Sequence, residues 1–186
     1  RASGMHFNDF METAIFKPLG LKRTFIEIPD SLNNEISFRS DEDIKYITES
    51  SIRQPNRPPS GGFGIYSTLY DLYRFAQCFL NGGTLDGVRV IGRKTVETMT
   101  RNQLESVSSF HWGAKCKTYR QGLGWGFYVD GPTVSPGCYN HEGWGWCALY
   151  NDPEEQFTYV SFIADDKDWN PDLQVKPRTI AWSGII

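Results

Sequence analysis

The sequence lacks any cluster of basic residues and any long apolar run. Its 19 Lys and Arg residues are balanced by 22 Asp and Glu residues, which gives a net charge of −3. Binding to a phosphate backbone needs a basic surface, so this charge excludes nucleic acid as an expected partner. A membrane-spanning helix needs about 20 consecutive apolar residues, and the longest apolar stretches, such as 159–164, are far shorter. We therefore expect no membrane span, and the compartment stays open.

The sequence is also poor in residues that bind metals. Its three histidines lie far apart, and its four cysteines, spaced by 38, 22 and 9 residues, match no paired zinc or redox pattern. We therefore predict no metal and no cofactor. Cysteine outside such patterns usually behaves as a small apolar residue, so buried thiols are expected. The four cysteines are Cys78, Cys116, Cys138 and Cys147.

What the sequence does contain is an ordinary globular composition, with 39% apolar, 22% charged and 15% aromatic residues. A chain of 186 residues that folds as one unit buries roughly 70% of its unfolded surface, so a core forms without metals or disulfides. One domain is therefore expected. Residues 1–104 are predicted to be mainly helix and loop, and residues 105–186 to form antiparallel strands and a C-terminal helix.

Apolar spacing predicts two helices in the first part of the chain. Apolar residues recur at helical spacing over 7–16, and Pro18 followed by Gly20 is expected to end that helix. A second helix is expected to begin after Thr68, with Asp71 as a capping-box acceptor. The expected buried face of this second helix carries Leu69, Leu72, Tyr73, Ala76 and Leu80.

Other segments are predicted from prolines, glycines and shorter patterns. The polar, proline-rich stretch 28–59 is typical of a long surface loop, and Asp86-Gly87 favours a tight hairpin. A third helix is expected over 94–101. A C-terminal helix is expected over 175–185, where Pro177 fits only the first turn.

From residue 122 onward the apolar period changes to two, which predicts strands. Strands are expected over 123–129, 139–142, 145–150 and 156–164, with a reverse turn over 151–154. Both alternating sets of the last strand are apolar, which indicates that it is covered on both faces. The predicted fold class is therefore α+β, an antiparallel sheet flanked by helices.

The printed sequence holds no self-contained catalytic set. Gly-x-Ser-x-Gly, Ser-x-x-Lys, Tyr-x-Asn and His-Glu-x-x-His patterns are all missing from it. One local feature has chemical potential, because His141 lies at a predicted strand edge among glycines, where an imidazole and bare backbone could reach a ligand. Alternatively, His141 is bonded to a neighbouring carbonyl in a glycine-bent strand and has no function.

A collinear series of segments resembles one known family. They are similar to the serine β-lactamase superfamily, and within it to the branch of class C β-lactamases, DD-peptidases and esterases. The segments are 15–21, 61–68, 71–76, 85–91, 95–100, 122–127, 141–145 and Asp152-Pro153-Glu154.

This resemblance implies a fold and a mechanism. The fold is the β-lactamase/transpeptidase-like α/β sandwich, with the active site between the sheet and a helical region. The mechanism passes through an acyl-enzyme, and its Ser-x-x-Lys and Tyr-x-Asn elements lie near the front of the family's polypeptide. Since neither pattern occurs here, residues 1–186 are similar only to the C-terminal portion of the family, a single incomplete domain. We expect such a chain to be inactive on its own.

The segment His141-Glu142-Gly143 is similar to the family's third element, on the strand that borders the active site. Carried over from the family, His141 supplies a donor or a positive charge, Gly143 leaves room for substrate, and the Trp144 N–H is one oxyanion donor. Glu142 and Gly145 are the residues expected to bind substrate. The family more often has Thr or Ser where Glu142 stands, and a carboxylate there would repel a substrate carboxylate. An ester or a neutral amide is therefore the favoured substrate.

Two functions stay open at this point. The chain is either the C-terminal portion of a serine hydrolase of esterase, amidase or DD-peptidase type, or a non-catalytic ligand-binding or interaction module of the same ancestry. The expected small-molecule partner is an ester or an amide. The expected macromolecular partner is the missing N-terminal region or a second copy, either of which could pair with an open sheet edge.

Overall fold

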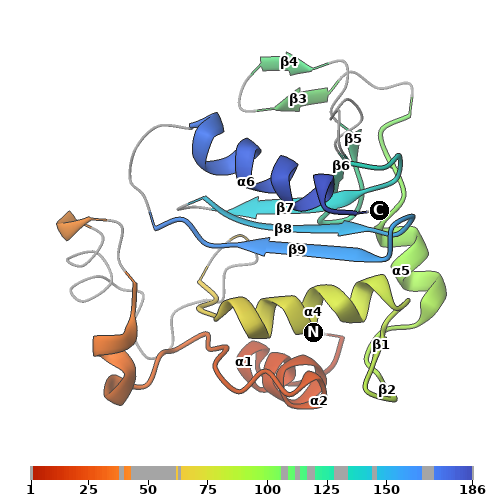
Figure 1. The fold of residues 1–186 in the computed structure, drawn as a ribbon. Coiled ribbons are helices and arrows are strands. Elements are labelled where there is room, and N and C mark those ends of the chain that lie inside the picture. The colour runs from red at the N-terminus through yellow and green to blue at the C-terminus, as the bar shows by residue number, and fades with distance from the viewer. Residues whose placement is uncertain are drawn as a thin grey trace.

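A computed structural model describes residues 2–37, 40–42, 62, 64–105, 109–111, 114–116, 120–127, 134–143, 146–164 and 170–185. Its helical segments, labelled in Figure 1, are α1 (Phe7–Met11), the π-helical η1 (Glu12–Phe16), α2 (Lys17–Leu19), the 3-10 helix η2 (Asp30–Glu35), α4 (Leu69–Leu80), α5 (Arg93–Met99) and α6 (Pro171–Ser183). The strands are β1 (Thr84–Leu85), β2 (Val88–Arg89), β3 (Ser109–His111), β4 (Ala114–Cys116), β5 (Arg120–Gln121), β6 (Gly126–Phe127), β7 (Tyr139–Gly143), β8 (Cys147–Asp152) and β9 (Phe157–Ser161). None of the described helices has the length and apolar character that crossing a membrane requires.

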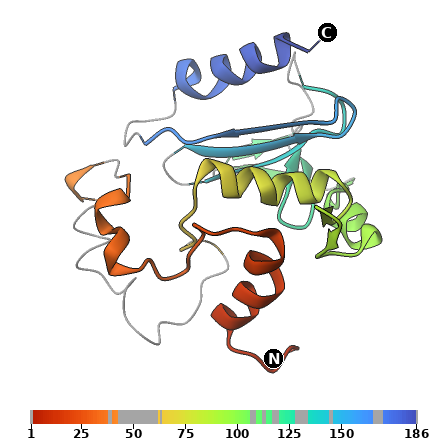
Figure 2. The ribbon, with the colours of Figure 1, turned by 60° about the horizontal axis from the view of Figure 1, so that its bottom comes forward.

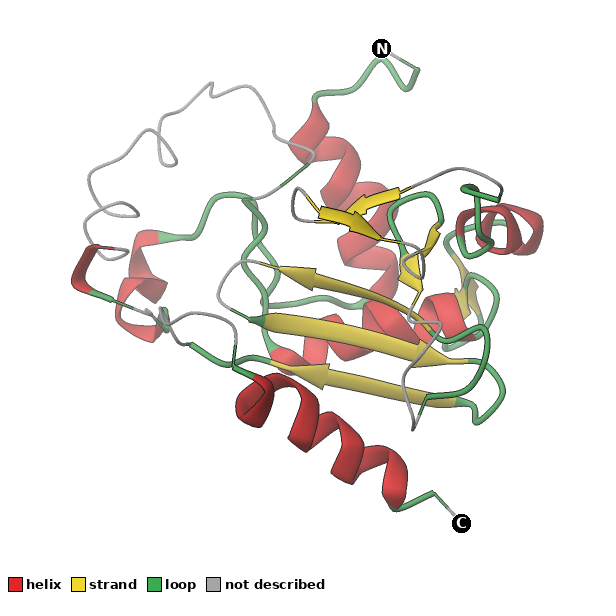
Figure 3. Ribbon diagram, turned by 90° about the horizontal axis from the view of Figure 1, so that it is seen from above, coloured by secondary structure: helices red, strands yellow, loops and turns green. Residues whose placement is uncertain are grey.

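One antiparallel sheet organises the described structure. It has five strands in the order β5-β6-β7-β8-β9, and two separate hairpins pair β1 with β2 and β3 with β4. Strands β7–β9 run side by side in Figure 3. The register of β7 and β8 begins at Tyr139↔Asn151 and ends at Gly143↔Cys147. Figure 2 shows α6 against one face of this sheet and α4 against the other. The predicted α+β class is therefore confirmed.

Alternate residues of the strands supply the two buried faces. Strand β9 contributes to both, with Val160 packed on the α4 side and Phe157 and Tyr159 on the α6 side, which confirms the prediction for this strand. The cluster on the α4 side contains Ala76, Phe79, Val96, Trp125, Phe127, Tyr139 and Leu149. The cluster on the α6 side contains Cys138, Ala148, Tyr150 and Trp182. A third cluster attaches the N-terminal helices to α4 through Phe16, Leu19, Leu21, Cys78 and Leu85.

The first helical stretch runs further than predicted. Pro18 does not end it, because α1 passes through the π turn η1 into α2 and ends at Leu19. The Lys17 N–H bonds to the Glu12 carbonyl in that wider turn, and Pro18 then occupies the first turn of α2, where its missing N–H costs little. Gly20 caps the end at a φ of +64°, so the glycine stop was predicted correctly.

Helix α4 begins where the sequence predicts. The Thr68 hydroxyl oxygen accepts a hydrogen bond from the Asp71 N–H at 3.2 Å, which is an N-cap. The expected role of the Asp71 carboxylate was wrong, because it accepts instead from the Arg23 N–H at 2.7 Å and the Thr24 hydroxyl at 2.9 Å. Asp71 therefore joins the start of α4 to the chain that follows α2.

The buried face of α4 is also rotated from the prediction. Leu69 and Tyr73, expected inside, are 48% and 43% exposed. The residues that pack on the sheet side are Leu72, Phe75, Ala76 and Phe79. The helical pattern was right, but two apolar stripes compete on this helix and the sheet covers only one.

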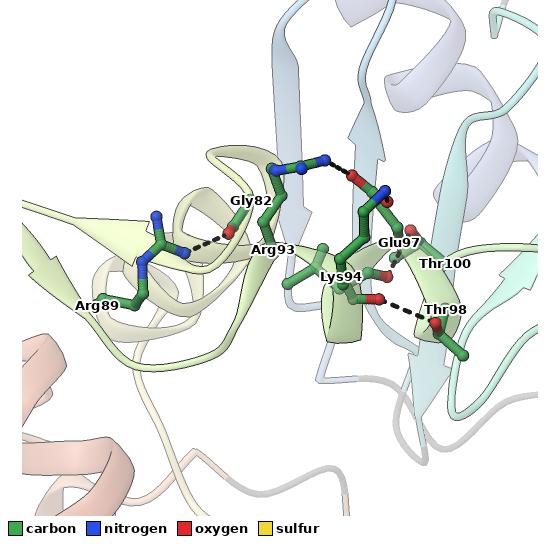
Figure 4. A network of polar contacts seen from close by, with 8 residues as sticks. Gly82, Arg89, Arg93, Lys94, Glu97, Thr98 and Thr100 are labelled. Carbon is green, nitrogen blue, oxygen red and sulfur yellow. Dashed lines mark hydrogen bonds and ion pairs between the residues drawn. The ribbon is translucent and has the colours of Figure 1, made fainter.

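The tight hairpin expected at Asp86-Gly87 joins β1 to β2, with φ values of +49° and +80° at these two residues. Polar contacts of the neighbouring helix α5 are drawn in Figure 4. Glu97 pairs with Arg93 and, at 2.7 Å, with Lys94, whose ammonium holds the pKa of the Glu97 carboxyl below its ordinary value. Helix α5 spans 93–99 rather than the predicted 94–101.

Several strand boundaries differ from the predictions. Instead of one strand over 123–129, a turn at 123–124 separates two short strands, β5 and β6, and residues 128–133 lie outside the described part. Strand β8 begins two residues later than expected, so the reverse turn moves to 153–156. Strand β9 ends at 161 rather than 164. Helix α6 begins at 171, not 175, which leaves Pro177 inside the helix.

The far edge of β5 is occupied by the segment that follows α5. The Gln103 N–H donates to the Gln121 carbonyl at 2.7 Å, and the Leu123 N–H donates to the Met99 carbonyl at 2.9 Å. A Cβ atom at Gly122 would lie 2.2 Å from the Met99 carbonyl oxygen, so only glycine allows this close approach. Most of the predicted loop 28–59 lies outside the described residues, and its described part contains η2.

Candidate functional site

Strand β7 carries the described part of the predicted site. It is the middle strand of the five, and Tyr139 at its start packs into the cluster on the α4 side. Side chains alternate along a strand, so His141 and Gly143 share that face of the sheet and Glu142 lies on the opposite one. The His141 side chain is exposed. Trp144 and Gly145, the other two predicted site residues, lie outside the described residues.

Gly143 lies directly opposite Cys147 on β8. A Cβ atom added at Gly143 would stand 2.7 Å from the Cys147 Sγ atom, closer than real Cβ contacts come. Cys147 is therefore a site neighbour that the sequence did not reveal, because the register of β7 and β8 sets the pairing. The absence of a side chain at 143 therefore has two possible explanations: it leaves room for substrate, or it leaves room for this sulfur atom.

The turn from β7 to β8 carries an unusual backbone conformation. Trp146 has a φ of +59°, a left-handed value that bulky residues rarely adopt. Its N–H donates to the Gly143 carbonyl at 3.1 Å. Trp146 thus closes the turn immediately beside Gly143, and no residue pattern in the sequence signals it.

The Glu142 carboxylate points toward α6. It accepts a hydrogen bond from the Tyr150 hydroxyl, and its Oε1 atom lies 4.0 Å from Nη1 of Arg178. Arg178 also donates to the Tyr150 hydroxyl. This placement argues against the predicted contact between the Glu142 carboxylate and substrate, because that carboxylate lies on the face of the sheet opposite His141. The preference for uncharged substrates that rested on it loses its basis.

Two buried polar residues at the end of β8 fix the layers around β7. The Asn151 amide donates to the Ala76 carbonyl of α4 at 2.9 Å and to the Tyr139 hydroxyl at 3.2 Å. The Asp152 carboxylate accepts from Trp182 Nε1 at 2.8 Å and from the Ser135 N–H at 3.0 Å. Burial alone would raise the pKa of the Asp152 carboxyl, but these donors outweigh burial and hold that pKa below its ordinary value.

The described thiols differ in burial. Cys78 and Cys138 are buried as predicted, whereas Cys147 is half-buried, and the side chain of Cys116 lies outside the described part. Burial, with a smaller contribution from Asp152, raises the pKa of the Cys138 thiol to about 12. Among the described residues no group of three or more His, Cys, Asp or Glu side chains is placed to hold a metal ion.

An antiparallel sheet with α6 on one face and α4 on the other is the arrangement that the resemblance to the β-lactamase/transpeptidase-like fold implies. The chain belongs to the beta-lactamase family, since the family model described as "Beta-lactamase" matches residues 1–181. This finding confirms the resemblance drawn from the sequence.

Similar proteins agree with this assignment. A Salmonella typhi protein named "Putative D-alanyl-D-alanine carboxypeptidase" is 25% identical over 193 residues, which cover 85% of this chain and 40% of that protein. A beta-lactamase from Mycobacterium bovis superposes with a TM-score of 0.67 at 18% identity, covering 98% of this chain and 56% of that one. A family VIII carboxylesterase superposes with a TM-score of 0.66 at 16% identity, covering 97% of this chain and 53% of that one. The chain thus spans about two fifths of the length of the curated relative.

Proposed function

We propose that this chain forms one wall of the active site of a serine hydrolase that works through an acyl-enzyme. In this proposal His141 supplies a hydrogen-bond donor or positive charge to substrate, and Gly143 lets the substrate lie against β7. The Trp144 N–H is one of two oxyanion donors, and Gly145 binds substrate. Glu142 acts from the opposite face of the sheet and does not touch substrate.

The observation that carries the proposal is the exposed imidazole of His141, two residues before Gly143 on the middle strand of a beta-lactamase-family sheet. A histidine kept only for packing would be buried and bonded to its surroundings. An exposed imidazole beside bare backbone can meet a ligand from solvent.

The attacking serine and its lysine are proposed to come from polypeptide outside these residues, because the sequence holds no Ser-x-x-Lys. A hydroxyl needs an adjacent base to become nucleophilic, and His141 alone does not complete such a pair here. The substrate is proposed to be a small ester or amide. The names of similar proteins, a carboxypeptidase and a carboxylesterase, include both bond types.

A covalent probe tests the proposal. We call a longer polypeptide that contains these residues together with the region proposed to carry the serine the longer product. Fluorescent penicillin and a fluorophosphonate should label this longer product and should leave the 186-residue chain unlabelled. In the longer product, His141→Ala should slow labelling at least tenfold, as expected for loss of a group that contacts the reacting substrate. Thr98→Ala, on the exposed side of α5, is the control and should label at the normal rate. Labelling of the 186-residue chain itself would contradict the proposed source of the nucleophile.

A non-catalytic module of the same ancestry is the second candidate, favoured by the missing Ser-x-x-Lys pattern. Such a module would bind its ligand without forming a covalent bond. The same probe separates the two functions, because a longer product that stays unlabelled by both reagents, yet binds an ester or amide reversibly, would support the module.

A further inference from the structure

The face of β7 that points away from His141 carries a polar cluster. Its three members, Glu142, Tyr150 and Arg178, come from β7, β8 and α6. The Arg178 Nη1 group donates to the Tyr150 hydroxyl, and that hydroxyl donates to Glu142 Oε1. Tyr150 is 1% exposed and Arg178 is 8% exposed, whereas the Glu142 side chain is 29% exposed. The cluster lies between the sheet and α6, with its carboxylate partly open to solvent.

A cluster of this kind contributes little net stability. Taking a carboxylate and a guanidinium out of water costs about as much as their attraction returns, and apolar residues of similar volume are often as stable in their place. Arg178 Nη1 and Glu142 Oε1 are 4.0 Å apart, too far for a direct hydrogen bond, so the Tyr150 hydroxyl links the two charged groups. Directed hydrogen bonds of this kind do fix the relative positions of the three side chains.

Helix α6 is itself held firmly enough to present Arg178 at one position. The Trp182 ring packs edge-on against the Tyr150 ring at 6.1 Å between centroids, and Trp182 Nε1 is bonded to Asp152. The Arg178 guanidinium lies 4.7 Å from the centroid of the Tyr150 ring, in cation–π range. The guanidinium is therefore held by stacking as well as by hydrogen bonding.

We propose that Arg178 and Tyr150 are positioning residues for the active site on β7. They hold the Glu142 side chain from behind and so fix the strand between His141 and Gly143. Because side chains alternate across a strand, a carboxylate anchored at 142 sets the direction in which His141 points on the other face. This inference rests on the proposed function, since it assigns the cluster to the same site.

Hydrogen exchange on the 186-residue chain tests the structural half of the inference. The single variant Arg178→Met leaves a half-buried carboxylate without its cation and can destabilise the chain. We therefore use Glu142→Leu/Tyr150→Phe/Arg178→Met, which replaces every partner by an apolar group of similar size. Amide exchange over 141–143 should become at least tenfold faster, while exchange over 157–161 changes less than twofold. Unchanged exchange over 141–143 would overturn the inference.

Kinetics of a longer, active product test the functional half. The triple variant should lower kcat for a fluorogenic ester at least tenfold and change KM less than twofold, because a misdirected imidazole affects the reaction more than binding. Arg178→Lys, which keeps a cation able to reach Tyr150, should retain more than half of the wild-type kcat. Arg93→Met, which removes an exposed arginine of α5, is the control and should leave kcat unchanged.

The two proposals fail separately. A wild-type longer product that is neither labelled nor active refutes the proposed function, and the exchange result still decides whether the cluster fixes β7. An active longer product whose kcat is unchanged in the triple variant overturns the positioning role and leaves the proposed function standing.

Discussion

Replacing Gly143 by alanine tests why this position lacks a side chain. The new Cβ atom would stand 2.7 Å from the Cys147 Sγ atom, roughly 1 Å inside an ordinary contact distance. Overpacking of this kind costs about 1–3 kcal/mol of unfolding free energy. The backbone itself adds no strain, because Gly143 is not among the glycines with positive φ.

Cys147→Ala removes the sulfur atom and should relieve the clash. Gly143→Ala should then cost less than about 0.5 kcal/mol in the Cys147→Ala background, which gives a coupling energy of about 0.5–3 kcal/mol in the double-mutant cycle. Urea denaturation followed by tryptophan fluorescence measures each free energy. Equal costs of Gly143→Ala in the two backgrounds would refute the reasoning that the sulfur atom sets the need for glycine.

The same substitutions, made in a longer product, separate the two possible reasons for glycine at 143, which are room for substrate and room for the Cys147 sulfur atom. If substrate also needs the bare backbone, the double variant made in a longer product regains stability but stays slow to label with fluorescent penicillin. If only the sulfur atom needs the space, both stability and labelling return. The assay thus reads the structural and the functional requirement independently.

Four further predictions follow from described contacts. Thr68→Ala removes the N-cap of α4 and should lower the unfolding free energy by about 1 kcal/mol in urea denaturation. The Asp152 carboxyl has a depressed pKa in the folded chain. Its stabilising effect is therefore complete above the unfolded value near pH 4 and is lost as pH falls through the folded value, so Asp152→Asn should flatten the loss of stability below about pH 4. The Cys138 thiol, with a pKa of about 12, should resist iodoacetamide at pH 8 while half-buried Cys147 is modified, as read by mass spectrometry. Strand β9 ends the described sheet, so the mass measured by light scattering should rise with concentration.

Each of these predictions has a control or a contrary result. Thr98→Ala, on the exposed side of α5, should change the unfolding free energy by less than about 0.5 kcal/mol, and an equal loss would deny that Thr68 acts as a cap. An unaltered acid profile in Asp152→Asn would assign the pH dependence to other groups. Alkylation of Cys138 as fast as Cys147 would show that α6 opens readily, and a monomeric mass at every concentration would contradict pairing at β9.

Signals that depend on neighbouring residues were read correctly from the sequence. The Thr68 cap, the Asp86-Gly87 turn and the Gly20 stop each need only a few residues along the chain. Pro18 and Pro177 misled the prediction, because a proline is expected to end a helix. In the structure the π turn η1 accommodates Pro18, and packing of α6 on the sheet holds a helix that includes Pro177.

Features that depend on packing between distant parts of the chain could not be predicted from the sequence. The side of α4 that faces the sheet is chosen by β8 and β9, so Leu69 and Tyr73 fit the helical pattern and are still exposed. At the candidate site, the position of β7 was predicted within one residue. The direction of the Glu142 carboxylate was not, since it depends on Arg178 in a helix that joins the opposite face.

The blocked edge of β5 limits how copies of this domain can combine. Because the Gln103 N–H already donates to the Gln121 carbonyl beside β5, the edge of the described sheet that another strand can join is β9. When two copies pair antiparallel through β9, the β9 edge of each copy becomes paired. The result is a two-fold symmetric dimer rather than an open filament. Strand addition at β9 of the described sheet therefore stops at two copies.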